Sequence, residues 1–166
     1  MKIRPMKIDD YEEVVAVWQA TGLSVDDYDD SWSRLKQLID KNRGGCLVAV
    51  SEGQIVGAVL GTYNGQRAWV YHLAVMPEYQ RLGIGKALIA KLEQWCQKVG
   101  AKKIKLAVLK ANNQALGFYE KLGYVADDDA ITLEKSLIGG DESERRENNA
   151  ILSFLGGDES AGWMQS

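Results

Sequence analysis

The stretch QRLGIGK, residues 80–86, combines two glycines with a glutamine and two cationic side chains. Glycines let successive backbone N–H groups turn toward one point without a Cβ clash, so this composition is typical of a loop that binds an anion. A periodic apolar stretch follows from Ile84, and the start of a helix there adds unpaired N–H donors and a positive dipole end. Arg81 and Lys86 contribute mobile positive charge. The loop therefore predicts a pyrophosphate site, with a plain glycine-rich turn as the alternative.

Two well-known phosphate loops do not fit this stretch. The P-loop pattern G-x-x-x-x-G-K-[ST] matches at Gly85-Lys86, but Gln80 stands where its first glycine belongs. The dinucleotide fingerprint G-x-G-x-x-G matches at Gly83 and Gly85, but Leu88 occupies its last position. What remains is the pattern Q-x-x-G-x-G.

Hydrophobic periodicity places this loop between a strand and a helix of one α/β (α+β) domain with a mixed sheet. The expected elements are strands at 2–6, 46–50, 54–63, 68–75, 103–109, 124–128 and 130–138, and helices at 11–18, 31–41, 84–99 and 113–122. Their order is β-α-α-β-β-β-α-β-α-β-β. Antiparallel hairpins, one of them turning at Asn64-Gly65, share the sheet with one β-α-β crossover.

Composition limits the classes of protein to which the chain can belong. The chain has 166 residues, 46% of them hydrophobic, which fits one globular domain. A net charge of -3 argues against a nucleic-acid partner. Cys46 and Cys96 lie in apolar patterns, so we expect buried thiols and no disulfide, and no metal-ligand spacing is visible. Without a signal-peptide core or an apolar run near ~18 residues, we expect a cytoplasmic protein with no membrane partner.

Residues 139–166 differ in character from the expected domain at 1–138. GGDES at 139–143 returns at 156–160, and residues 141–155 between the copies could form a helix. Asp141 and Glu144 are spaced like a capping box, and apolar residues follow. The segment is either an appended tail or a docking helix, which would cover a surface of the same chain or form a homodimer.

Two segments resemble signatures of the GNAT superfamily of N-acetyltransferases. VMPEYQRLGIGKALIAKLE (75–93) resembles its acetyl-CoA loop, [QR]-x-x-G-x-[GA], and NNQALGFYEKLGY (112–124) resembles its N-x-x-A-x-x-F-Y-x-K-x-G-[FY] segment. The order of elements is also similar, over about residues 2–137, and residues 3–23 resemble small bacterial YpeA-like members. The resemblance implies a GNAT-like acyltransferase fold and direct acetyl transfer from acetyl-CoA to a primary amine of a small molecule or protein. The alternative is a CoA-binding sensor or interaction module without catalysis.

The resemblance also implies roles for individual residues. Pantetheine would enter where the strand before the loop splays at a bulge, and a backbone N–H near Val75 would stabilise the oxyanion. Tyr119 would protonate the departing thiolate, unless it is only a core aromatic. Asn112 would hold pantetheine, cap the following helix, or both. The implied cofactor-binding residues are Leu73, Ala74, Val75, Gln80, Arg81, Leu82, Gly83, Ile84, Gly85, Lys86, Asn112, Ala115, Phe118 and Tyr119.

The catalytic base and the acceptor site remain open in the sequence. His72, the only histidine, lies on the strand before the loop and is either the base or a structural histidine; Tyr71 or a water chain could serve instead. Strand alternation places His72 opposite Leu73 and Val75. The acidic stretch VDDYDD (25–30) either attracts a cationic acceptor or caps a helix. The acceptor-site candidates are Asp26, Asp27, Tyr28 and Tyr71.

Overall fold

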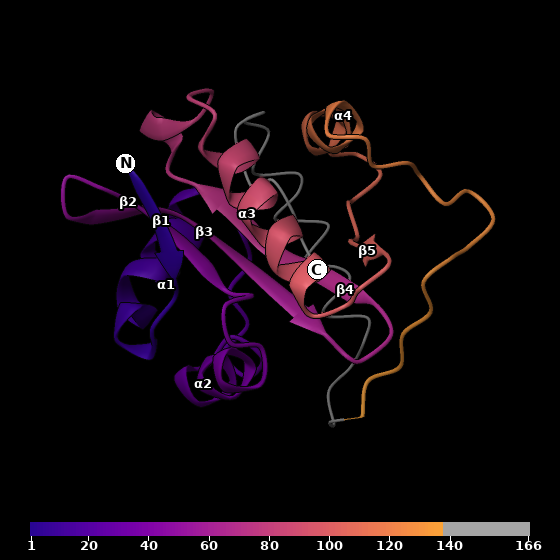
Figure 1. Cartoon of the computed structure of the whole chain (residues 1–166), viewed down its shortest axis with the longest axis horizontal. Helices are drawn as coiled ribbons and strands as arrows, with labels where there is room; N and C mark the ends of the chain where they lie inside the picture. Colours follow the sequence, from indigo (N-terminus) through magenta and orange to yellow (C-terminus); the bar gives the residue numbers. More distant parts are fainter. Residues whose placement is uncertain (138–166) are drawn as a thin grey trace.

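The computed structural model describes residues 1–137 of the chain (Figure 1). In chain order the elements are β1 (Lys2–Pro5), the 3-10 turn η1 (Ile8–Asp10), α1 (Tyr11–Ala20), α2 (Trp32–Lys41), β2 (Leu47–Ser51), β3 (Gln54–Tyr63), β4 (Ala68–Val75), the 3-10 turn η2 (Pro77–Tyr79), α3 (Ile84–Lys98), β5 (Ile104–Lys105) and α4 (Asn113–Lys121). The strands of the described residues form one sheet in the order β1-β2-β3-β4-β5. The first four are antiparallel neighbours, and β5 runs parallel to β4. The expected mixed sheet is confirmed.

The sheet separates two hydrophobic cores. On one face α3 buries Ile84, Leu88 and Leu92, spaced every four residues, against the inward side chains of the strands. The opposite face is covered by α1 and α2, with Trp18 and Leu35 in the second core. Figure 1 shows α3 running along the middle strands and α4 lying beyond the β4–β5 side. The two faces of β4 therefore meet different surroundings.

The hairpin turn predicted at Asn64-Gly65 joins β3 to β4. The Asn64 side-chain oxygen accepts hydrogen bonds from the main-chain N–H groups of Gln66 and Arg67, both at 2.9 Å. Gly65 has a φ of 92°, a left-handed value that glycine adopts at little cost. The turn thus sets the register of β4, the strand that leads to the anion loop.

A bulge interrupts β4 near its end. Tyr71 pairs with Leu60 and Ala74 with Ala58, so His72 and Leu73 together stand opposite the single residue Val59. His72 accommodates the extra residue with a φ of 50°. Histidine is among the non-glycine residues enriched in this left-handed region.

The strands β4 and β5 separate soon after they meet. Their pairing is limited to Ala68 with Ile104 and Trp69 with Lys105. Among the described residues, no strand continues the sheet beside β4 beyond Trp69 on that side. The C-terminal half of β4 thus has an edge that the sheet leaves open, directly before the anion loop.

The last expected strands are wrong for the described residues. The strand predicted at 103–109 is only Ile104–Lys105, and residues 124–137 contain no strand. They lead away from α4 in a long arc (Figure 1), with Ile131 and Leu133 more than 80% exposed. A strand needs a neighbour's main-chain groups, and β5 offers only a short edge, so alternating apolar residues alone do not produce one. The predictions for the tail and its helix at 141–155 lie outside the described residues.

Two further expectations concern the whole domain. Cys46 and Cys96 are buried free thiols in opposite cores, which confirms that they form no disulfide. Within residues 1–137, no helix has the length and apolarity needed to span a bilayer.

Candidate functional site

The anion loop leaves β4 through η2 and ends at the start of α3. Gln80 is anchored there, since its side-chain Nε2 donates to the Val75 carbonyl at 2.9 Å. Arg81 and Gly83 have φ values of 61° and 82°, so left-handed residues alternate with ordinary ones. Such alternation turns successive N–H groups toward one side, as in anion-binding nests.

The first turn of α3 supplies donors to this loop. Within residues 1–137, the main-chain N–H groups of residues 83–86 donate to no other residue, and the first bond of the helix runs from Ala87 to the Gly83 carbonyl. Unpaired N–H groups at a helix start, together with its dipole, favour a bound anion. These donors are available for the predicted pyrophosphate.

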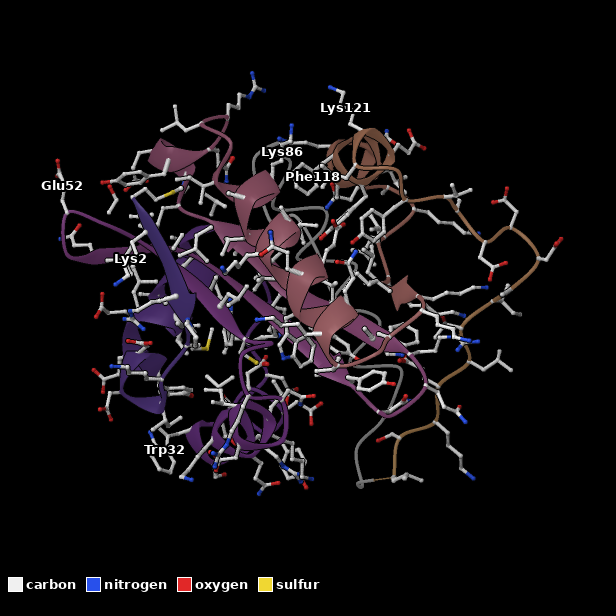
Figure 2. All side chains as sticks on the ribbon, viewed as in Figure 1. Lys2, Trp32, Glu52, Lys86, Phe118 and Lys121 are labelled. Carbon is white, nitrogen blue, oxygen red and sulfur yellow. The ribbon has the colours of Figure 1, made fainter. Side chains whose placement is uncertain are left out.

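A pocket of about 290 Å³ opens between this loop and α4. Its lining residues are Val75, Tyr79, Gln80, Arg81, Gly83, Ile84, Gly85, Lys86, Phe118, Lys121 and Leu122. Figure 2 shows Lys86, Phe118 and Lys121 gathered where α3 begins and α4 lies alongside. Gly85 leaves the pocket deeper than any other residue would, because a Cβ there would lie in the pocket, 3.5 Å from the Phe118 ring. The amide donors, the cationic rim and the absent side chain fit a diphosphate.

The pocket joins the two segments that carry the family resemblance. Residues 80, 81 and 83–86 meet Phe118 in it, although about 30 residues separate them in sequence. Lys121 was missed as a lining residue, although the second signature contains it. Leu82 points outward and is 69% exposed. Its predicted cofactor contact, like that of Leu73 and Ala74, stays a prediction.

Asn112 caps α4. Its side-chain oxygen accepts a hydrogen bond from the Ala115 N–H at 3.0 Å, which confirms the capping role of Asn112. Ala115 itself is buried. A contact of either residue with pantetheine stays a prediction.

Tyr119 lies on the inner side of α4. It is 3% exposed, between the rings of Phe118 at 5.0 Å and Tyr124 at 5.3 Å between centroids. Burial raises the pKa of the Tyr119 phenol above its ordinary value, so it carries its proton at neutral pH. Tyr124 donates through its hydroxyl to Glu93 at 3.0 Å and so ties the segment that follows α4 to α3.

His72 faces the other core, as strand alternation predicted. Its Nε2 lies 2.7 Å from Oδ1 of Asp30, and both residues are buried. The Trp18 ring packs edge-on against the imidazole, with 4.8 Å between ring centroids. Leu73 and Val75 belong to the opposite core with α3. Nothing in the acidic stretch indicates that Asp30, one of its four aspartates, is the residue that meets His72.

The acidic stretch at 25–30 is largely a folded turn. Asp26 accepts hydrogen bonds from the N–H groups of Tyr28 and Asp29, at 2.9 and 2.8 Å. Asp30 Oδ2 in turn accepts from the Asp26 N–H at 2.8 Å. Asp26 and Asp30 thus stabilise the turn itself and do not cap a helix, because the N-cap of α2 is Ser31, whose side chain accepts from the Arg34 N–H. Asp27 is exposed.

The remaining acceptor candidates are Tyr28 and Tyr71. Tyr28 is half exposed beneath the Arg34 guanidinium, 4.5 Å from the ring centroid. Tyr71 is partly buried and stacks on Trp69 with 6.4 Å between ring centroids. Neither lies in the anion pocket. Among residues 1–137, no group of three or more His, Cys, Asp or Glu side chains could hold a metal ion.

Comparison with known proteins places the chain in one family. The model of the acetyltransferase (GNAT) family matches residues 11–124. The acetyltransferase SG1711 of Sodalis glossinidius (strain morsitans) is 35% identical over 142 residues, covering 86% of this chain and 99% of the relative.

Solved structures share the fold. PaiA N-acetyltransferase of Thermoplasma acidophilum, in complex with coenzyme A, aligns with a TM-score of 0.64 and 22% identity, over 76% of this chain and 91% of that one. AAC(6')-Iy, in complex with the bisubstrate analogue CoA-S-monomethyl-acetylneamine, aligns with a TM-score of 0.68 and 17% identity, over 81% and 97%.

Proposed function

Because this chain belongs to the acetyltransferase (GNAT) family and is an N-acetyltransferase that uses acetyl-CoA, we propose that its acceptor is a primary amine bound on the α1–α2 side of β4. The observation that carries the proposal is the row of N–H groups at residues 83–86, which have no acceptor in the described part of the chain and line a cationic pocket beside the open end of β4. Acetyl-CoA, when bound, supplies an acyl group activated as a thioester.

The protein's own groups divide between the two faces of β4. On the α3 face, residues 80–86 and Lys121 would hold the diphosphate, and the edge of residues 73–75, which no strand within residues 1–137 covers, would offer main-chain groups to the pantetheine arm. On the α1–α2 face lie His72 and the acidic turn. A cationic amine suits that second face, because the carboxylates of residues 26–30 attract it.

Transfer requires two proton movements. The carbon–nitrogen bond forms as the carbon–sulfur bond breaks, so the amine gives up a proton and the thiolate takes one. His72 is the proposed base, because it adjoins the open strand end and histidine is the side chain that most often serves as a general base. Tyr119 holds a proton at its hydroxyl and is the proposed donor. AAC(6')-Iy shares this fold and binds a bisubstrate analogue that joins CoA to acetylneamine, which supports an amine acceptor for this chain.

The test is acetyl transfer to a panel of amines: neamine, spermidine, and a peptide with a free α-amino group and a lysine. We expect thiol release that depends on the amine, together with an acetylated product detected by mass spectrometry. Replacement of His72 by Asn, which tolerates the left-handed backbone, is expected to lower kcat with little change in CoA binding by calorimetry. Tight CoA binding without transfer to any amine, across a wider panel, would favour the sensor instead.

A further inference from the structure

Asp30 and His72 are 42 positions apart in sequence, yet their side chains meet at 2.7 Å inside the second core. We propose that Asp30 is a positioning residue that fixes the tautomer of His72, with the proton on Nε2 and the lone pair on Nδ1. The proposal rests on the proposed function, because it matters for catalysis only if His72 is the base.

The carboxylate of Asp30 is held in place from several directions. Its Oδ2 accepts from the Asp26 N–H at 2.8 Å, and its main-chain carbonyl accepts from the Tyr11 hydroxyl at 3.0 Å. Asp30 and His72 are 9% and 8% exposed. A buried carboxylate whose two oxygens each have a fixed partner can orient an imidazole, whereas an exposed one would exchange with water.

The ring of His72 is fixed in the same way. The bulge sets its left-handed backbone, and Trp18 packs edge-on against the imidazole at 4.8 Å between centroids. An ionised carboxylate only accepts hydrogen bonds, so the nitrogen facing Asp30 must carry the proton. In the neutral ring the lone pair then lies on Nδ1, and a proton taken there gives an imidazolium beside a carboxylate. In serine proteases a buried carboxylate likewise holds the tautomer of an imidazole, there through Nδ1 with Nε2 as the base, and Asp→Asn lowers kcat about 10⁴-fold.

Replacement of Asp30 by Asn should reverse the tautomer without changing the shape of the side chain. The Asp26 N–H can only donate, so the amide oxygen of the new residue must face it. The amide NH₂ group then faces Nε2 of His72, which must become an acceptor, and the ring proton moves to Nδ1. The base would thus have its lone pair on the wrong nitrogen.

The experiment uses the full chain and its only histidine, so the imidazole nitrogen signals in a ¹H–¹⁵N spectrum need no assignment. In the wild type we expect the neutral ring to carry its proton on Nε2, and in Asp30→Asn on Nδ1. With the panel amine of highest turnover, we expect Asp30→Asn to lower kcat at least tenfold while CoA affinity by calorimetry stays the same. Asp40→Asn is the matched control, because it removes an exposed carboxylate on α2 and should change neither measurement.

Each contrary result has its own meaning. A wild-type ring protonated on Nδ1, or a tautomer that Asp30→Asn does not change, overturns the proposal, and the first of these needs no variant to fold. A reversed tautomer with wild-type kcat shows that Asp30 has a structural role only, which also overturns it. Wild-type kcat in His72→Asn overturns instead the proposed role of His72 as base, while the spectra still decide whether Asp30 sets the tautomer.

Discussion

Gln80 donates a hydrogen bond through Nε2 to the Val75 carbonyl at 2.9 Å, and this bond ties the anion loop to the end of β4. We expect Gln80→Ala to weaken CoA binding about fivefold, because one such bond contributes about 1 kcal/mol. Gln80→Glu should weaken it more than tenfold, since it places a negative charge beside a diphosphate. Calorimetry with CoA measures both. Gln97→Ala, on the exposed far end of α3, should bind normally; equal loss in that variant would mean that the effect is not local.

The absence of a side chain at Gly85 should matter for binding rather than for stability. An Ala methyl there meets the Phe118 ring at ordinary contact distance, 3.5 Å, and the Val75 side chain at 3.9 Å, so it fits the fold but fills the pocket floor. We expect Gly85→Ala to raise the CoA Kd about tenfold, or about 1.4 kcal/mol, with an unchanged or slightly higher melting temperature. The control is Gly117→Ala in α4, whose new methyl meets nothing within 4 Å. Unchanged affinity in Gly85→Ala would place the diphosphate elsewhere.

Substitution of Tyr119 is expected to affect catalysis, and substitution of Tyr124 is expected to affect stability. Because burial raises the pKa of the Tyr119 phenol, full proton transfer costs more than from a free phenol, and we expect Tyr119→Phe to lower kcat by about 10²-fold or less. Tyr124→Phe removes the bond to Glu93 and should cost about 1 kcal/mol of unfolding free energy while kcat is retained. Steady-state kinetics and urea unfolding test both. Full turnover in Tyr119→Phe would make that residue a core aromatic only.

Asp10 should make stability depend on pH in the acid range. It accepts two bonds from Arg4, at 2.7 and 2.9 Å, and one from the Lys7 N–H at 2.8 Å. The Arg4 guanidinium lowers the pKa of Asp10 below the unfolded value of about 3.9, so the pair stabilises the fold above that pH. The contribution is lost as pH falls through the lowered pKa. We expect Asp10→Asn to lose about 1–3 kcal/mol at pH 7 and to approach the wild type as pH falls below about 4. A difference independent of pH in urea titrations would contradict this.

The thiols of Cys46 and Cys96 should be unreactive in the native chain. Burial raises the pKa of Cys46 to about 12 and that of Cys96 to about 11, so on the order of one thiol in 10³ to 10⁴ is ionised at pH 8. We expect no reaction with Ellman's reagent in buffer and two thiols per chain in urea. The same reagent then reports released CoA without a protein background, and rapid native labelling would contradict the prediction.

Local features of the site could be predicted from the sequence. The Asn112 cap depends on residues three apart, and the loop at 80–86 depends on glycines and on the helix that follows directly. The opposite orientations of His72 and Leu73 were predicted from strand alternation, but Val70 shares the core of Leu73, so the bulge is what turns His72 to the other face.

Non-local features could not be predicted. Asp30 reaches His72 only because the turn after α1 folds back onto β4, and nothing in VDDYDD distinguishes that aspartate. The early separation of β5 from β4, and with it the absence of strands at 124–137, depends on main-chain partners that no single stretch specifies. The family resemblance suggested the bulge, but its φ of 50° at His72 required the structure.

The early parting of β4 and β5 leaves the sheet unfinished where the substrate is expected. A ligand that hydrogen-bonds to that edge takes the place of a missing strand, so its binding stabilises the folded state. At a concentration one hundred times its Kd, it adds about 2.7 kcal/mol to the free energy of unfolding. We therefore expect a cell short of the thioester to hold a looser polypeptide that proteases remove sooner. Metabolic supply would then govern the abundance of the enzyme as well as its rate.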